Sequence, residues 1–297
     1  MAPLAFQPLA GIYEPSAIQQ LPDARFLVVE DEKEHPFSLI SFTADGRLAG
    51  PPISVATPDR LNDLEGLTIC PNGFLYAITS HSRDSDGKRK KSRCRLLRFR
   101  LTGESITDAV LTEGLLPALI AAHPALAAAA DVSDVKEEGG LNIEALEMSP
   151  DGTQLLVGLR GPLIEGQAVL AVLASPDALF DAGTPIGVAV RLLDLDGQGI
   201  RGIAWVPALS GYLVIAGPLF RAPAPFRLWF WNGTDSAAQA VSVPGLRDLA
   251  RAEGVAAALI GGIPSVLLVS DDGNREEGRN AGHLLLAISQ FRIGSSA

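Results

Sequence analysis

A pair of short apolar segments joined by a polar turn recurs five times along the sequence. In each copy a polar residue precedes a small residue and an aliphatic one, as in EGLTICPNGFLYAITSH from Glu65 and EALEMSPDGTQLLVGLRGP from Glu144. The Pro, Asn, Asp and Gly residues between the segments are typical of turns, so each pair predicts a β-hairpin. The other copies begin at Ser16, Arg201 and Glu253, and a third apolar segment follows every pair.

Five such units, most with a fourth segment, predict one all-β domain over residues 1–297: a β-propeller of five four-stranded blades. A β-sandwich or barrel is the alternative, and a sixth blade is the other blade count that stays open. In the last unit His283–Ile293 is the third segment, and no fourth segment follows it in the sequence. We therefore expect Pro3–Gly11 to supply the missing strand and close the ring, which removes the exposed sheet edges.

The longest gap between units, at about residues 113–140, is rich in Leu and Ala. This composition predicts short helices, interrupted at Pro117 and Pro124. Because the connection between two blades emerges at the mouth of the central channel, we expect this helical insertion to cover part of the mouth and gate access.

The polar residues that open each first strand and close each second strand should meet at this same channel mouth. The openings are Ser16, Glu65, Glu144, Arg201 and Glu253, and the closings include Asp31, His81, Arg160, Asp271 and Asp272. Three carboxylates about 8 Å apart at an effective dielectric constant of ~20 would repel by about 2 kcal/mol per pair. A bound cation, the two arginines or carboxyl groups of raised pKa must offset that repulsion.

Oxygen ligands without Cys and with one His favour Ca²⁺, then Mg²⁺ or Mn²⁺. The predicted metal ligands are Glu65, Glu144, Glu253, Asp271 and Asp272. Neutralisation of the glutamates by Arg160 and Arg201, with no metal, is the alternative. We expect catalytic roles for Glu65, Glu144 and His81. The predicted substrate-binding residues are Arg160, Arg201 and Arg83, which would hold a small anionic ligand.

The EGL…PNG…LYAITSHS and EGV…LLVSDDG units resemble the phytase-like (esterase-like) propeller domains. The segments LNIEALEMSPDG, GLRGPLIEGQA and FRLWFW are similar to an uncharacterised bacterial propeller family of unknown function, over nearly the whole chain. The phytase-like resemblance implies Ca²⁺ bound by carboxylates at the mouth and hydrolysis of phosphate esters. Arg201 and Ser16 stand where that pattern has acids, which leaves room for an anionic ligand held by arginine.

Three hypotheses follow for the function. The first is a divalent-metal-dependent hydrolase of a small anionic ester, with phosphate esters favoured. The second is a lactonase-type propeller enzyme that acts on a neutral substrate. The third is a propeller that binds a ligand or a protein at its mouth without catalysis, because a fold alone does not fix an activity.

Composition indicates which partners and which cellular location to expect. The net charge of −10 argues against nucleic-acid binding, and the basic stretch at Gly87–Arg100 is predicted to be a solvated segment. No uninterrupted apolar stretch suits a membrane span. Without a secretory signal, and with Cys70 and Cys94 on strands too far apart for a disulfide, we expect a cytoplasmic monomer.

Overall fold

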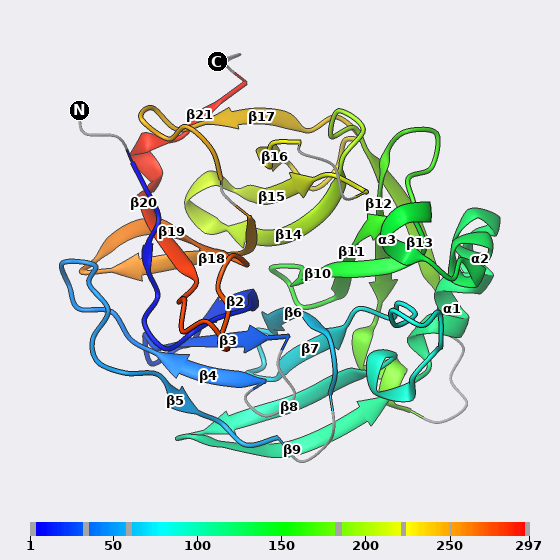
Figure 1. Ribbon diagram of the computed structural model, residues 1–297, viewed down its shortest axis with the longest axis horizontal. Helices are drawn as coiled ribbons and strands as arrows, with labels where there is room; N and C mark the ends of the chain where they lie inside the picture. The colour runs from blue at the N-terminus through cyan, green and yellow to red at the C-terminus, as the bar shows by residue number, and fades with distance from the viewer. Residues whose placement is uncertain are drawn as a thin grey trace.

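Five antiparallel sheets are arranged around a central channel in the computed structural model (Figure 1). The structure describes residues 4–31, 36–57, 61–181, 186–220, 224–249 and 251–294. Each sheet is one blade, and the first strand of each repeat is the innermost strand of its blade. The five-bladed propeller predicted from the repeats is confirmed.

The blades follow one another in chain order. Blade 1 comprises β2 (Pro15–Gln20), β3 (Phe26–Glu30), β4 (Phe37–Ile40) and β5 (Ile53–Ser54). Blade 2 comprises β6 (Leu64–Ile69), β7 (Leu75–Thr79), β8 (Leu96–Thr102) and β9 (Ser105–Thr112). Blade 3 comprises β10 (Asn142–Met148), β11 (Gln154–Gly161), β12 (Ala168–Ala174) and β13 (Val188–Leu193). Blade 4 begins with β14 (Gly199–Val206), β15 (Gly211–Gly217), β16 (Arg227–Trp231) and β17 (Gln239–Ser242). Blade 5 has β18 (Ala252–Ile260), β19 (Ile263–Ser270) and β20 (Gly282–Ala287).

A short strand near each end of the described chain is built into the ring. Strand β1 (Gln7–Pro8) pairs with β20 and supplies the fourth strand of blade 5, as the sequence predicted for this segment. The segment expected to be the third strand of that blade ends earlier than predicted, because a short 3₁₀ turn at Ile288–Gln290 breaks it. The chain then forms β21 (Arg292–Ile293), which pairs with β17 as a fifth strand of blade 4.

The apolar middles of the strands form the core between adjacent blades. Strands β7 and β15 are buried along their whole length, as expected for segments covered on both faces. Cys70 follows β6 at the end of the channel far from the mouth. Cys94 precedes β8 at the mouth end, so both cysteines lie just outside the first and third strands on which they were predicted. Both thiols are buried and free, as predicted.

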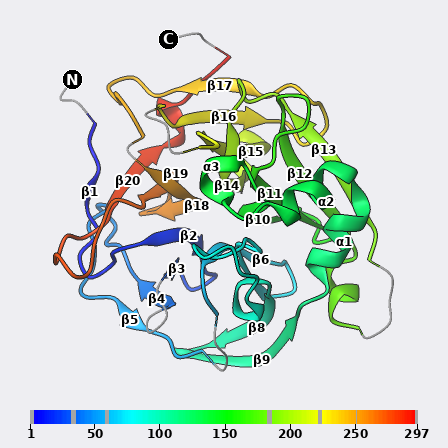
Figure 2. The same cartoon turned by 45° about the vertical axis from the view of Figure 1, so that its right-hand side comes forward.

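The insertion between blades 2 and 3 folds into α1 (Leu115–Ala122), α2 (Pro124–Asp131) and the single turn α3 (Val135–Glu138). Figures 1 and 2 show α1 and α2 at the outer edge of the ring beside blade 3, while α3 lies on the side of the ring that faces the reader in Figure 1. Leu115, Leu119 and Leu126 are buried against the core of blades 2 and 3. No helix within the described ranges is long and apolar enough to cross a membrane.

Candidate functional site

Every innermost strand carries a β-bulge at the same place. The register of each first hairpin shifts across one unpaired residue, next to the end of the strand that faces the mouth. These unpaired residues are Ser16, Glu65, Glu144, Arg201 and Glu253. A bulge re-aims a side chain that a regular strand would direct onto a neighbouring sheet. The five bulges therefore make a ring of residues that line the channel.

The small residue after each bulge allows the inner strands to approach one another closely. A Cβ atom on Gly202 would lie 2.2 Å from the Glu253 carbonyl oxygen of the next blade. A Cβ atom on Gly66 would lie 2.6 Å from Cβ of Leu146. Both distances are shorter than real Cβ contacts, so only glycine fits at these two positions.

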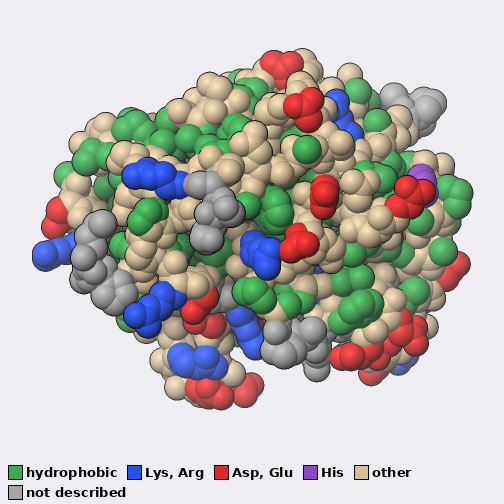
Figure 3. All heavy atoms as spheres, turned by 90° about the horizontal axis from the view of Figure 1, so that it is seen from above, with side chains coloured by type: hydrophobic (Ala, Val, Ile, Leu, Met, Phe, Trp, Pro, Cys, Tyr) green, Lys and Arg blue, Asp and Glu red, His purple; other side chains and the backbone are tan. Residues whose placement is uncertain are grey.

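The ring lies at the base of a cavity of about 740 Å³ that opens at the channel mouth. Its lining includes most of the predicted site residues: Glu65, Glu144, Glu253, Asp271, Arg83, Arg160 and Arg201. His81 and Asp272 do not line it. The view from above places charged side chains along the lower edge, which belongs to the mouth face (Figure 3).

Arg201 neutralises two glutamates of the ring. Its Nε lies 2.7 Å from Glu144 Oε2, and its Nη2 contacts Glu253 Oε1. All three side chains are almost fully buried. The guanidinium group also lies over the ring of Phe226, 5.2 Å from its centroid. Blades 3, 4 and 5 are thus joined across the channel by one cation.

Glu144 has further partners on its other carboxylate oxygen. Asn142 Nδ2 donates to Glu144 Oε1 at 2.7 Å, and Arg160 Nη1 donates to the same oxygen at 3.3 Å. Burial raises the pKa of Glu144 to about 7, against the lowering effect of Arg201, while Glu253 raises it further. The alternative of arginine neutralisation therefore describes this side of the cavity.

The opposite side of the cavity, between blades 5, 1 and 2, is acidic. No hydrogen bond or ion pair with a cationic side chain is found there for the Glu65, Asp31 or Asp271 carboxyl groups, within the ranges given above. Burial, followed by the nearby Asp63 carboxylate, raises the pKa of Glu65 well above its usual value. Desolvation and Asp63 likewise raise the pKa of Asp31 to about 7. Desolvation and Glu253 raise the pKa of Asp271 to about 8.

Asp31 and Asp63 form a close carboxyl pair across the seam between blades 1 and 2. The Asp63 carboxylate lies close enough to Asp31 to disfavour its ionised form and so to raise the pKa of Asp31. Arg93 Nη2 contacts Asp63 Oδ2 and donates to Ser82 Oγ at 2.7 Å. This arginine holds Asp63 in place at the cavity wall.

His81 is turned away from the cavity, so the structure does not support its predicted position at the mouth. Its backbone has a left-handed φ of 56°, and its side chain is only 1% exposed. Nδ1 lies 2.7 Å from the Thr79 carbonyl oxygen, while Nε2 has no hydrogen-bond partner. Desolvation lowers the pKa of His81 to about 4, so the imidazole is neutral near pH 7.

Part of the basic stretch Gly87–Arg100, together with the nearby Arg83, makes contacts within the protein. Arg83 Nε and Arg89 Nη2 both donate to the Ala130 carbonyl oxygen, at 3.2 and 2.5 Å. Arg98 forms an ion pair with Asp177 at 2.7 Å. Lys90 Nζ lies 2.7 Å from Asp84 Oδ2. Lys88, Lys90 and Lys91 are exposed, as predicted for a solvated segment, while Arg83 and Arg89 tie blade 2 to the helical insertion.

The predicted metal ligands do not fit a directly coordinated divalent cation as they are arranged. Arg201 already occupies Glu144 and Glu253, and Asp272 Oδ1 accepts a hydrogen bond from Ser270 Oγ at 2.7 Å. No three His, Cys, Asp or Glu side chains within the described part of the chain are placed to hold a metal ion together.

Several cavity residues were not predicted from the sequence, among them Glu14, Asp63, Arg93 and Asn142. Three of these share a simple spacing that could have identified them. Glu14, Asp63 and Asn142 each stand two positions before a bulge residue, where the strand enters from the mouth. Arg93 has no such signal, because it lies in the long loop between β7 and β8.

A family model matches residues 103–285, more than half of the chain. The chain belongs to the family described as "Protein of unknown function (DUF3616)". No curated protein matches this DUF3616 chain. The resemblance to phytase-like propellers stays a prediction.

Solved structures of low sequence identity are similar to nearly the whole chain. One is a protein from Thermus thermophilus described as an oxidoreductase (glucose dehydrogenase), with 17% identity and a TM-score of 0.47, covering 95% of this chain and 100% of that one. Another is the PQQ-bound form of an aldose sugar dehydrogenase from Streptomyces coelicolor, with 14% identity and a TM-score of 0.44, covering 98% and 99%. At this level the similarity concerns the fold alone.

Proposed function

We propose that this DUF3616 protein is a hydrolase that uses carboxyl groups as acid and base on a small neutral ester or lactone. The observation that carries the proposal is Glu65. Its carboxyl group faces the cavity from the ring, lacks a cationic partner among the described residues, and has a strongly raised pKa. A protonated carboxyl beside an ionised one is the arrangement that acid–base catalysis requires.

The Asp31–Asp63 pair supplies the complementary base. The ionised Asp31 carboxylate of this pair accepts a proton from a water molecule as the water attacks the acyl carbon. Glu65 donates its proton to the alcohol oxygen as the bond between that oxygen and the acyl carbon breaks. The products are a carboxylic acid and an alcohol, and the proton taken up by the pair returns to Glu65 through water. The raised pKa of Asp31, about 7, suits a base that works near neutral pH.

The charge of the cavity favours a neutral substrate. Each cationic side chain that lines the cavity has a partner within the protein, and the Arg201 and Arg160 pairs are buried. An anion would have to displace these carboxylates and then face the acidic side. The lactonase-type activity fits this balance better than the metal-dependent hydrolysis of a phosphate ester. The small anionic ligand and the Ca²⁺, Mg²⁺ or Mn²⁺ cofactor expected from the sequence stay predictions.

A substrate panel tests the proposal. Purified protein is assayed with para-nitrophenyl acetate and butyrate, γ- and δ-lactones and para-nitrophenyl phosphate, each with EDTA or with added Ca²⁺. We expect ester or lactone hydrolysis that persists in EDTA and falls about a hundredfold in Glu65→Gln. The matched control is Asp272→Asn, which lies outside the cavity and should retain the rate. Phosphate hydrolysis only with Ca²⁺ would overturn the proposal, and binding without turnover would favour a non-catalytic propeller.

A further inference from the structure

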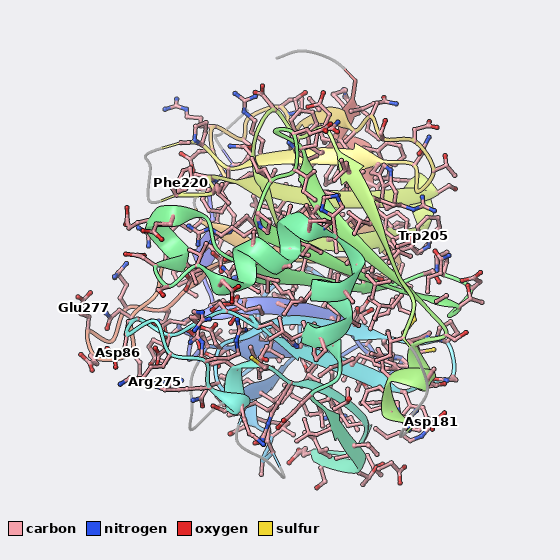
Figure 4. The ribbon with its side chains drawn as sticks, turned by 90° about the vertical axis from the view of Figure 1, so that its right-hand side faces the viewer. Asp86, Asp181, Trp205, Phe220, Arg275 and Glu277 are labelled. Atoms are coloured by element: carbon pink, nitrogen blue, oxygen red, sulfur yellow. The ribbon has the colours of Figure 1, made fainter. Side chains whose placement is uncertain are left out.

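The segment Val132–Gly140, which we call the flap, stands over the mouth of the cavity. Ser133, Asp134, Val135 and Glu137 contribute to the cavity lining. In Figure 4 the mouth face is on the left, where Phe220 and Asp86 mark the loops of blades 4 and 2. The flap lies between these two loops: its Ser133 is next to Gly87, and its Gly139 is next to Leu219 and Phe220.

The hydrogen bonds of the flap are local. Glu138 N donates to Asp134 O, Gly140 N donates to Val135 O, and Glu137 N donates to Asp134 Oδ1. Val132 N donates back to Ala129 O. Leaving aside the Lys136 side chain, which the structure does not describe, no hydrogen bond or ion pair joins the flap to another blade. Its outer positions are exposed, so little apolar burial holds it down.

The base of the flap is fixed. Leu141 N donates to Ala129 O at 3.0 Å, which brings the two ends of the segment together as in an Ω-loop. Ala129 and Leu141 are buried in the core, and Arg83 and Arg89 bind the Ala130 carbonyl oxygen beside them. Gly139 has a left-handed φ of 72° and is followed by Gly140, which provides a site for backbone rotation next to the rigid base.

We propose that the flap is a gate that rotates about its fixed base at Ala129–Leu141 and controls the entry of bulky ligands into the channel-mouth cavity. Helices α1 and α2 stay in place because their apolar side chains belong to the core. In the closed position the flap rests on Gly87 on one side and on Leu219 and Phe220 on the other. This gate does not depend on the chemistry proposed for Glu65.

A disulfide across the closed contact tests the gate without any activity assay. A Cβ atom on Gly87 would lie 3.1 Å from Ser133 Cβ, close to the ~3.5–4.5 Å of disulfides, and the left-handed φ of 72° at Gly87 adds backbone strain to a Cys there. We add Asn62→Cys, which lines the cavity, as a reporter thiol. Labelling of the oxidised Gly87→Cys/Ser133→Cys/Asn62→Cys variant is compared with that of Asn62→Cys alone. The unmodified protein corrects for the two buried thiols.

The expected result is selective for size. The locked variant should react with a bulky dye maleimide at about one tenth of the rate of Asn62→Cys, or more slowly still. A small methanethiosulfonate should react with both proteins at a similar rate. Equal maleimide rates in the locked variant and in Asn62→Cys would overturn the gate. Hydrogen exchange gives a second measurement: the Glu138 and Gly140 amides should exchange about a hundredfold faster than those of Leu126 and Ala127 in α2. Equal protection would contradict the proposal.

Discussion

Arg201 Nε lies 2.7 Å from Glu144 Oε2, with both side chains more than nine-tenths buried at the centre of the ring. Neither atom has a hydrogen bond of good geometry, so the contact is an ion pair. Arg201 also forms an ion pair with Glu253, so two buried carboxylates share this one cation.

Replacement of Arg201 by Met should therefore lower the free energy of unfolding by about 3–5 kcal/mol, because it leaves the buried Glu253 carboxylate without its cation and Glu144 with Arg160 alone. Urea denaturation followed by circular dichroism measures the change. The control is Arg227→Met, whose pair with Asp196 is exposed and should cost less than about 1 kcal/mol. Similar losses for the two variants would contradict the role assigned to Arg201.

Glu65→Gln should make the protein more stable and less active. Folding raises the pKa of Glu65, so between the unfolded and folded pKa values the native state binds more protons, and stability falls as pH rises. The amide removes this dependence. We expect a gain of about 1 kcal/mol at pH 8 and none at pH 4. Thermal melts at the two pH values check the sign, and a gain only at pH 4 would refute it.

Gly202→Ala should be strongly destabilising, because its Cβ would lie 2.2 Å from the Glu253 carbonyl oxygen. Moving the backbone of one inner strand should cost on the order of 2–4 kcal/mol. Gly187→Ala is the matched control, since its Cβ would meet no atom within 4 Å. That variant should lie within about 1 kcal/mol of the parent in denaturant unfolding.

Glu147, at the far end of the channel, should make the stability of the protein depend on pH. It is buried on β10, and desolvation raises its pKa well above the usual value, against the lowering effect of the Trp205 backbone. The protonated native form loses stability as pH rises, by the same sign argument as for Glu65. Glu147→Gln should therefore weaken the fall in melting temperature between pH 6 and 9. The Glu147→Gln variant should hydrolyse esters at the parent's rate, because Glu147 lies outside the cavity.

The repeat in the sequence was sufficient to predict the blades and the residues that turn into the channel. Glu65, Glu144, Arg201 and Glu253 share one register in their repeats, and the register places them in one ring. The bulges that aim these side chains were not visible, since a bulge is defined by the partner strand. The β21 pairing was missed because a two-residue strand on a neighbouring blade has no pattern of its own.

Pairing across the channel could not be predicted either. Whether Arg201 neutralises Glu144, Glu253 or a ligand depends on side chains from three blades that are adjacent only after the ring closes. The orientation of the His81 side chain could not be predicted from the sequence either. Its position at the end of β7 predicted a place at the mouth, but its left-handed backbone turns the imidazole into the protein.

The pairing of β1 with β20 has a consequence for how the protein is made. A ribosome adds the residues between Pro8 and Gly282 in roughly 15–55 seconds, at ~5–20 residues per second. During that time the emerging chain is an open arc whose first strand has no partner. The acidic wall of the cavity uses Asp271 from the last blade, so it too is absent until synthesis is nearly finished. The cavity is therefore completed after translation, and truncated products should lack the site altogether.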